Sequence, residues 1–207
     1  MLESLLLLPF VISAFSSHNL EAAYALETQH FIANTDKNII LDVPYFHQIN
    51  SLTEQGKKEN GGSACGPTAL AMVLSYEGLN FTLDEVINKL PNNVYVKGVM
   101  FYDLAAGPEI FGKKAIEIEQ NPTSYYNILK EGKPIVLNVQ NYDGVVGHAL
   151  VIVGMAGYNG KTADALIVHD PLKSSYQSFE YINNNTLKQP AGYSLPIGII
   201  KPFYVED

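Results

Sequence analysis

The chain has 207 residues, of which 47% are hydrophobic and 16% are charged, and this is enough to bury the core of one globular domain. Its formal net charge is −8, with 13 Lys and Arg and no basic cluster, so no nucleic acid partner is expected. A single cysteine excludes an internal disulfide and a thiolate zinc site, and no HExxH or Cys-x-x-Cys spacing calls for a metal or another cofactor.

The first 25 residues have the pattern of a secretory signal. An apolar run from Leu5 to Phe15 is followed by polar residues, and Ala23-Tyr24-Ala25 has the small-x-small pattern of a signal-peptidase site. The run is shorter than the about 20 residues of a membrane span. Because it is preceded by no Lys or Arg, an ordinary amphipathic helix is the alternative. We therefore predict a signal peptide over residues 1–25, an N-terminal extension over 26–40, and one domain over 41–207. The mature protein would be secreted or extracytoplasmic, without an integral membrane segment.

A strand and a loop are predicted before the cysteine. Ile39 to Gln48 has a strand pattern that is closed by a turn at Asn50-Ser51. Asn50 to Ala64 is polar and contains several glycines, and its only apolar residues are Leu52 and Ala64. We expect an exposed and mobile loop there, either a substrate-recognition loop or a plain insertion.

The only cysteine, Cys65, stands at the start of a predicted helix. From about Thr68 the residues are strong helix formers with an apolar face, Pro67 is tolerated in a first turn, and Glu77-Gly78 ends the helix. The unpaired N–H groups and the dipole of a helix N-terminus favour a thiolate, and Gly66 leaves the sulfur uncrowded. This is the environment of a reactive cysteine, although a small buried apolar residue is the alternative interpretation.

Shorter elements follow. Thr82-Leu83-Asp84-Glu85 is a capping box that opens a helix ending at Pro91. A short helix near Met100 to Ala106 and a short strand near Ala115 to Ile118 come next. Another helix runs from Thr123, as its cap, to Lys130, with Gly132 as its stop.

The second half of the chain is rich in β-branched residues. Four runs predict strands: Pro134 to Gln140, His148 to Met155, Ala165 to His169 and Ile197 to Pro202. Helices therefore come first and a sheet second. This segregation predicts an α+β domain in which the Cys65 helix packs on a mostly antiparallel sheet.

Two of these strands form a predicted hairpin with Asn159-Gly160 at its tip. If pairing is centred on Gly160, Asp170 lies opposite Leu150 and on the same face as His148, within the diagonal reach of about 7–8 Å. His169 then points to the opposite face, and a slip of one residue would reverse these assignments. A carboxylate beside an imidazole orients a general base and stabilises its imidazolium, although His148 could also be a surface residue.

Four segments together resemble the C39-like branch of the papain-fold cysteine peptidases, and the resemblance covers roughly Leu41 to the C-terminus. They are Val43-Pro44-Tyr45-Phe46-His47-Gln48, Cys65 to Leu74, Gly147 to Gly154 and His169-Asp170-Pro171. The resemblance implies a papain-like fold, with an N-terminal helical part, and a peptide or protein substrate.

The resemblance also implies a role for each of four residues. Cys65 would be the nucleophile, His148 the general base and Asp170 the residue that orients it, while Gln48 would supply the side-chain donor of the oxyanion hole. In many relatives the Gln lies only a few residues before the Cys, whereas 16 residues intervene here. Gln55 is therefore the alternative donor.

The chemistry of such a site is acyl transfer. A thiolate–imidazolium pair attacks a carbonyl, the Cys65 N–H and a Gln amide meet the oxyanion, and His148 protonates the leaving amine. The product is an acyl-enzyme, which water or another amine could resolve. We therefore predict a thiol-dependent peptidase, with an acyltransferase or transpeptidase and an inert peptide-binding module as alternatives. The oligomeric state and the substrate sequence stay open.

Overall fold

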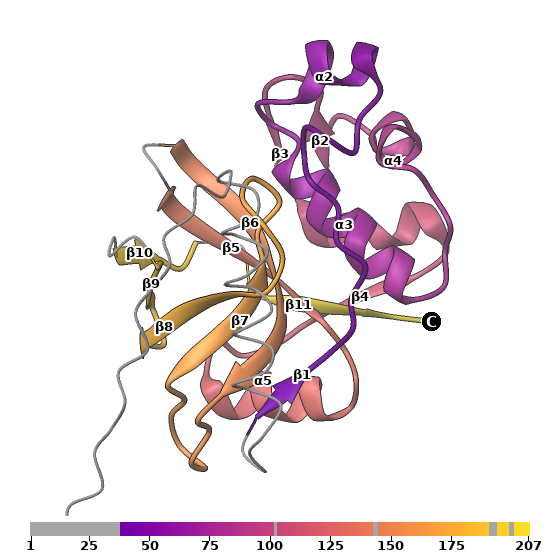
Figure 1. The fold of residues 1–207 in the computed structure, drawn as a ribbon. Coiled ribbons are helices and arrows are strands. Elements are labelled where there is room, and N and C mark those ends of the chain that lie inside the picture. The colour runs from indigo at the N-terminus through magenta and orange to yellow at the C-terminus, as the bar shows by residue number, and fades with distance from the viewer. Residues whose placement is uncertain (1–37, 102, 143–144, 191–193, 199–200) are drawn as a thin grey trace, which may run out of the picture.

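The computed structural model describes residues 38–207 apart from 102, 143–144, 191–193 and 199–200. A group of helices packs beside one large curled sheet (Figure 1). The predicted signal peptide and most of the predicted extension lie outside the described residues. Within the described part of the chain, no helix is both long and apolar enough to cross a membrane.

The large sheet carries the second half of the chain, as predicted. Its strands are β1 (Ile39–Ile40), β4 (Lys114–Glu117), β5 (Ile135–Tyr142), β6 (Val145–Ala156), β7 (Ala165–His169), β8 (Gln177–Asn183), β9 (Thr186–Lys188), β10 (Ser194–Pro196) and β11 (Phe203–Glu206). They lie in the order β10-β9-β8-β7-β6-β5-β11-β4, and β1 pairs with β6. All of these pairings are antiparallel. Ile197, just after β10, bridges to Val139 of β5, so the sheet curls back on itself.

The helices belong mainly to the first half of the chain. They are α2 (Glu54–Asn60), α3 (Cys65–Tyr76), α4 (Leu83–Lys89), α5 (Pro122–Lys130) and the two 3₁₀ turns η1 (Leu104–Ala106) and η2 (Pro108–Phe111). A small two-stranded sheet joins β2 (Tyr95–Val96) to β3 (Met100–Phe101). The described residues thus form an α+β domain with a mostly antiparallel sheet.

Helix α3 is the buried centre of the helical group. Every residue from Cys65 to Leu74 is buried, and these residues are apolar or small on all sides of the helix. A helix of that composition has no face suited to water, so it packs between the sheet and α4. It ends as predicted, because Gly78 takes a left-handed conformation with φ of 82°.

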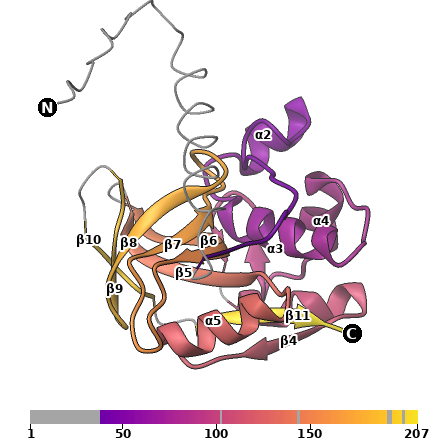
Figure 2. The ribbon, with the colours of Figure 1, turned by 60° about the horizontal axis from the view of Figure 1, so that its bottom comes forward.

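Two hydrophobic cores lie on the two faces of the sheet. Along β6, Ala149 and Val151 join the core that contains α3, whereas Leu150 and Ile152 join the core that contains α5. This alternation is the period of two of a strand that is buried on both faces. Figure 2 shows α5 and α3 on different sides of β5 and β6.

Several boundaries differ from the predictions. Only Ile39–Ile40 of the predicted strand up to Gln48 pairs in the sheet, and after it Leu41 donates one hydrogen bond to the Val153 carbonyl. Helix α5 is capped by Asn121, whose side chain accepts from the Ser124 N–H, and not by Thr123. The predicted strand from Ile197 to Pro202 is wrong as placed, because the last strand begins at Phe203. The capping box at Thr82 and Glu85 is confirmed.

The prediction of an exposed loop over Asn50 to Ala64 is wrong. Residues 54–60 form α2, and Thr53 caps it by accepting a hydrogen bond from the Gly56 N–H. Asp84 of α4 accepts from both the N–H and the hydroxyl of Thr53, at 2.9 and 2.8 Å. At the other end, Asn60 is buried and accepts from the Tyr95 hydroxyl. Polar contacts at both ends therefore hold the segment, together with Leu52, which is buried in the core that contains α3.

Candidate active site

Cys65 is the first residue of α3, as predicted, and it is buried with 7% of its surface exposed. Ala64 precedes it and provides no side-chain cap, so no carboxylate or hydroxyl of that residue competes for the first N–H groups of the helix. Gly66 has a packing role beyond the predicted one. A Cβ there would lie 2.6 Å from Cδ1 of Phe101, so the small residue allows β3 to lie against the start of α3.

His148 and Asp170 are hydrogen-bonded to each other. The His148 Nε2 atom lies 2.8 Å from Oδ1 of Asp170, and both side chains are buried. At this end of the hairpin, Val151 pairs with His169 and Ile152 with Val168, which is the predicted register. A bulge between Ile152 and Gly154 shifts the pairing only towards the other end. The predicted approach of His148 to Asp170 is thereby confirmed.

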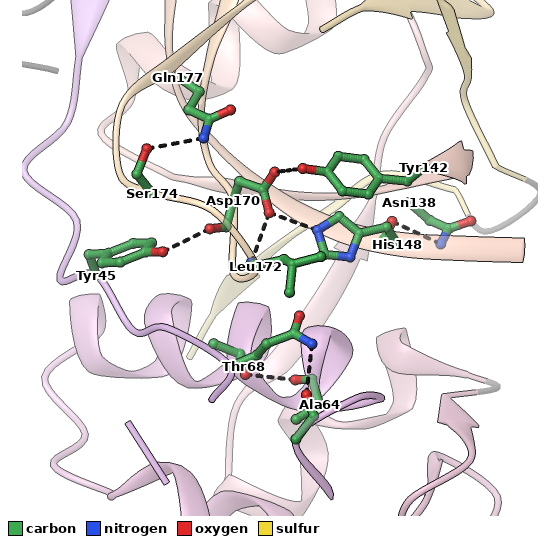
Figure 3. A network of polar contacts seen from close by, with 12 residues as sticks. Tyr45, Ala64, Thr68, Asn138, Tyr142, His148, Asp170, Leu172, Ser174 and Gln177 are labelled. Atoms are coloured by element: carbon green, nitrogen blue, oxygen red, sulfur yellow. Dashed lines mark hydrogen bonds and ion pairs between the residues drawn. The ribbon is translucent and has the colours of Figure 1, made fainter. Parts of the chain in front are cut away.

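The Asp170 carboxylate is held on both oxygens. Oδ1 accepts from His148 and from the Leu172 N–H at 2.9 Å, while Oδ2 accepts from the Tyr142 hydroxyl. The main-chain carbonyl of Asp170 accepts from the Tyr45 hydroxyl at 2.9 Å (Figure 3). Because Asp170 is fully buried, these donors replace the water that would otherwise solvate its charge.

Cys65 and Asp170 both act on the charge of His148. Burial by itself lowers the pKa of His148, but hydrogen bonds to Asp170 and Cys65, together with their charges, outweigh burial and raise the pKa to about 9. The imidazole therefore carries a proton at neutral pH in this environment. In Figure 3, His148 lies over the start of α3, where Ala64 and Thr68 are labelled.

His169 lies outside this cluster, as alternation along β7 predicted. Its Nε2 atom donates to the Val43 carbonyl at 2.9 Å, and its Nδ1 atom accepts from the Tyr176 N–H at 3.1 Å. The ring is fully buried, and this burial lowers the pKa of His169 to about 4. His169 is thus a neutral structural histidine near pH 7 that ties β7 to the segment after β1.

The two candidate glutamines have different environments. Gln48 is 3% exposed, its N–H donates to the Pro171 carbonyl, and its Nε2 atom donates to the Gly61 carbonyl at 2.9 Å. It therefore lies between the residue after Asp170 and the segment that leads into Cys65. Gln55 is exposed on α2 and pairs with Glu59. The structure thus places Gln48, and not Gln55, beside the segments that carry Asp170 and Cys65.

The sequence interpretation missed Tyr142. This residue is 1% exposed, its ring stacks on the His148 ring with centroids 4.2 Å apart, and its hydroxyl donates to Asp170. It is the last residue of β5, the strand next to the one that carries His148, and it follows the polar residues Gln140 and Asn141. Tyr142 pairs with Val145 of β6, and Val139 is the partner of His148, so the contact between the two rings would have followed only from the β5–β6 pairing, whereas the predicted hairpin covered only β6 and β7.

The described residues contain no group of three or more His, Cys, Asp or Glu side chains that could hold a metal ion. The cluster instead has the components of thiol chemistry: a cysteine at a helix N-terminus, a protonated imidazole beside it and a carboxylate behind the imidazole. An α+β domain with such a cluster is typical of the class of thiol-dependent enzymes.

The comparison with protein families identifies the group within that class. Residues 40–189 match the profile of the Peptidase_C39 like family. The match covers most of the chain and includes all four candidate site residues, so the protein belongs to this family, and the membership indicates a cysteine peptidase in general terms. No curated protein matches the chain significantly.

Proposed function

We propose that this protein cleaves a peptide or amide bond through an acyl-enzyme on Cys65. The observation that carries the proposal is the buried hydrogen bond between His148 and Asp170, together with the interaction of the same imidazole with Cys65. An imidazolium beside a cysteine favours the thiolate, which is the nucleophilic form. Membership of the C39-like family supports the same reaction class. We also propose that the α+β domain has the papain-like fold.

Each residue has a stated role in the proposal. The Cys65 sulfur attacks the carbonyl carbon and forms a C–S bond, while the carbonyl oxygen gains the negative charge. His148 then donates its proton to the leaving amine as the C–N bond breaks, and Asp170 holds the ring in place. Water, deprotonated by the neutral His148, then attacks the thioester carbonyl, the C–S bond breaks, the acid is released and the thiolate–imidazolium pair is restored.

Gln48 is the proposed side-chain donor of the oxyanion hole. Its amide nitrogen carries two hydrogens, and one is engaged by the Gly61 carbonyl. That bond fixes which end of the amide is nitrogen, and it leaves the second hydrogen for the oxyanion. The Cys65 N–H at the start of α3 would be the other donor.

An acyltransferase or transpeptidase would use the same first half-reaction, and a peptide-binding module would use none of it. Incubation with a peptide library, followed by mass spectrometry, distinguishes the three. A peptidase gives water-derived products that Cys65→Ala abolishes, whereas a transferase gives amine adducts when an acceptor amine is supplied. If the wild type and Cys65→Ala give the same peptide profile and the same binding, the protein is a binding module.

For the N-terminus we propose export, with residues 1–25 as the signal peptide. Expression of the full chain with a C-terminal tag, followed by N-terminal sequencing of the released protein, tests this proposal. A mature N-terminus after Ala25 would support it, and an intact Met1 in the cytosolic fraction would contradict it.

A further inference from the structure

The inference concerns Tyr142, which touches two members of the proposed catalytic cluster at once. Its hydroxyl donates to Oδ2 of Asp170, the carboxylate oxygen that His148 does not use. Its ring stacks on His148 with an interplanar angle of 30° and a centroid separation of 4.2 Å. In Figure 3 the Tyr142 hydroxyl points at the carboxylate from the same side as the imidazole.

The hydroxyl has a specific electrostatic effect. Asp170 is completely buried, so a carboxylate oxygen without a donor would be left unsolvated. Tyr142 satisfies Oδ2 while Leu172 and His148 satisfy Oδ1. The ionised carboxylate is thereby stabilised in the orientation in which it accepts from His148.

The ring has a second and separate effect. An aromatic face within about 6 Å of a cation attracts it, and this attraction is stronger where water is excluded. His148 is 2% exposed and its ring lies against the face of Tyr142. The stack therefore favours the charged imidazolium over the neutral imidazole.

We propose that Tyr142 is a positioning residue that maintains the thiolate–imidazolium pair of Cys65 and His148, through its hydroxyl on Asp170 and its ring on His148. The inference rests on the proposed function for the identity of the nucleophile. It adds that a fourth side chain, on the strand next to the histidine, is required for the reactive state of the cysteine.

The test measures alkylation of Cys65 by iodoacetamide at pH 6 and at pH 10, which requires no knowledge of the substrate. At pH 6 an ordinary thiol is almost entirely protonated, so rapid alkylation reports the ion pair. At pH 10 the imidazole has lost its proton, because the pKa of His148 is about 9, and the rate reports only access to a lone thiolate. A purely structural role of Tyr142 would change both rates or neither.

Two variants separate the two contacts. Tyr142→Phe keeps the ring and removes the hydroxyl, and it should lower the rate at pH 6 about tenfold. Tyr142→Leu removes both contacts and should lower that rate about a hundredfold. Both should keep the wild-type rate at pH 10 within about twofold. Tyr125→Phe is the matched control, because Tyr125 is equally buried and its hydroxyl has no hydrogen-bond partner among the described residues.

The outcomes are decisive in both directions. A selective loss at pH 6 in Tyr142→Phe, absent from Tyr125→Phe, supports the proposal, and it would do so even if no peptide were ever cleaved. Wild-type rates at pH 6 in Tyr142→Phe, or equal losses at pH 6 and pH 10, overturn it. If the circular dichroism spectrum of Tyr142→Leu differs from that of the wild type, this variant is not folded correctly. The rates of Tyr142→Phe then decide the test.

Discussion

The Gln48 side chain donates a hydrogen bond to the Gly61 carbonyl, across the segment that separates this glutamine from the cysteine. The 16 intervening residues therefore do not displace Gln48 from the cluster. The segment leads away from Gln48 into α2 and comes back to it at Gly61, so both ends of the segment lie at the glutamine. The segment with α2 and the proposed oxyanion donor are thus one structural unit.

Replacement of Gln48 should reduce turnover without reducing the reactivity of the Cys65 thiol. Gln48→Ala removes one oxyanion donor, and we expect kcat to fall by about 10²–10³ in a peptide cleavage assay. Iodoacetamide alkylation of Cys65 should change little, because alkylation forms no oxyanion. Gln55→Ala is the matched control and should retain wild-type kcat, since Gln55 is exposed on α2. A loss of kcat in Gln55→Ala, with wild-type kcat in Gln48→Ala, would show that Gln55 is the donor.

The two buried histidines should have opposite phenotypes. His148→Ala should reduce kcat/KM by about 10³ or more, because it removes the proposed general base. His169→Ala should chiefly lower the melting temperature, since His169 links the Val43 carbonyl to the Tyr176 N–H. An inactive but stable His169→Ala, beside an active His148→Ala, would reverse the assignment of the two rings.

The protonated state of His148 should define the alkaline limit of activity. Since the pKa of His148 is raised to about 9, the imidazolium is present below that pH and is lost above it, so kcat/KM should fall as pH rises through about 9. Asp170→Asn keeps an acceptor but removes a charge that raises this pKa. It should retain part of the activity, with a loss of about 10- to 100-fold, and its alkaline limit should move to lower pH. An unchanged limit would indicate that Asp170 only orients the ring.

His169 should make the protein sensitive to acid. Burial lowers the pKa of His169 to about 4 in the folded state, while the unfolded chain titrates near 6.5. The contribution of the neutral ring to stability is therefore complete above about pH 6.5 and is lost as pH falls towards 4, by about 3 kcal/mol. Urea unfolding at pH 7, 5.5 and 4.5 measures this loss in the free energy of unfolding. His169→Gln, which cannot titrate, should lose less stability over this range, and a parallel loss would assign the acid sensitivity to other groups.

The anchors of α2 should contribute measurably to stability. Asp84→Ala leaves the N–H and hydroxyl of Thr53 without their shared acceptor, and we expect a loss of about 1 kcal/mol in the free energy of unfolding. Asp103→Ala, at an exposed aspartate that caps no helix with its side chain, is the control. Deletion of residues 53–59 should destabilise the protein further, because it removes α2 itself. Equal stability of the deletion variant would mean that α2 is dispensable.

The sequence predicted those parts of the fold that depend on local chemistry. The helix at Cys65, the capping box at Thr82 and the pairing of Val151 with His169 follow from helix propensity, side-chain capping and strand alternation. The approach of His148 to Asp170 could be predicted because both lie on one hairpin, where a single register fixes their distance.

Features that depend on contacts between distant segments were not predicted. Helix α2 was missed because its anchors, Asp84 and Tyr95, lie 31 and 35 residues away from Thr53 and Asn60. Tyr142 was missed because its role depends on its contacts with β6 and with the loop after β7. Strand β8 was missed because its apolar residues alternate with polar ones and form no apolar run, and β9 and β10 were missed because each has only three residues.

The complete burial of α3 has a consequence for how the site can respond to a bound molecule. A helix enclosed on all sides cannot shift or rotate without opening the core around it, so the sulfur of Cys65, the proposed nucleophile, is a fixed point in the molecule. In the proposed peptidase, adaptation to differently shaped peptides would therefore come from the elements around α3 and not from the sulfur. In the proposed peptidase, selectivity and reactivity are therefore carried by different parts of the chain, and one can diverge while the other is preserved.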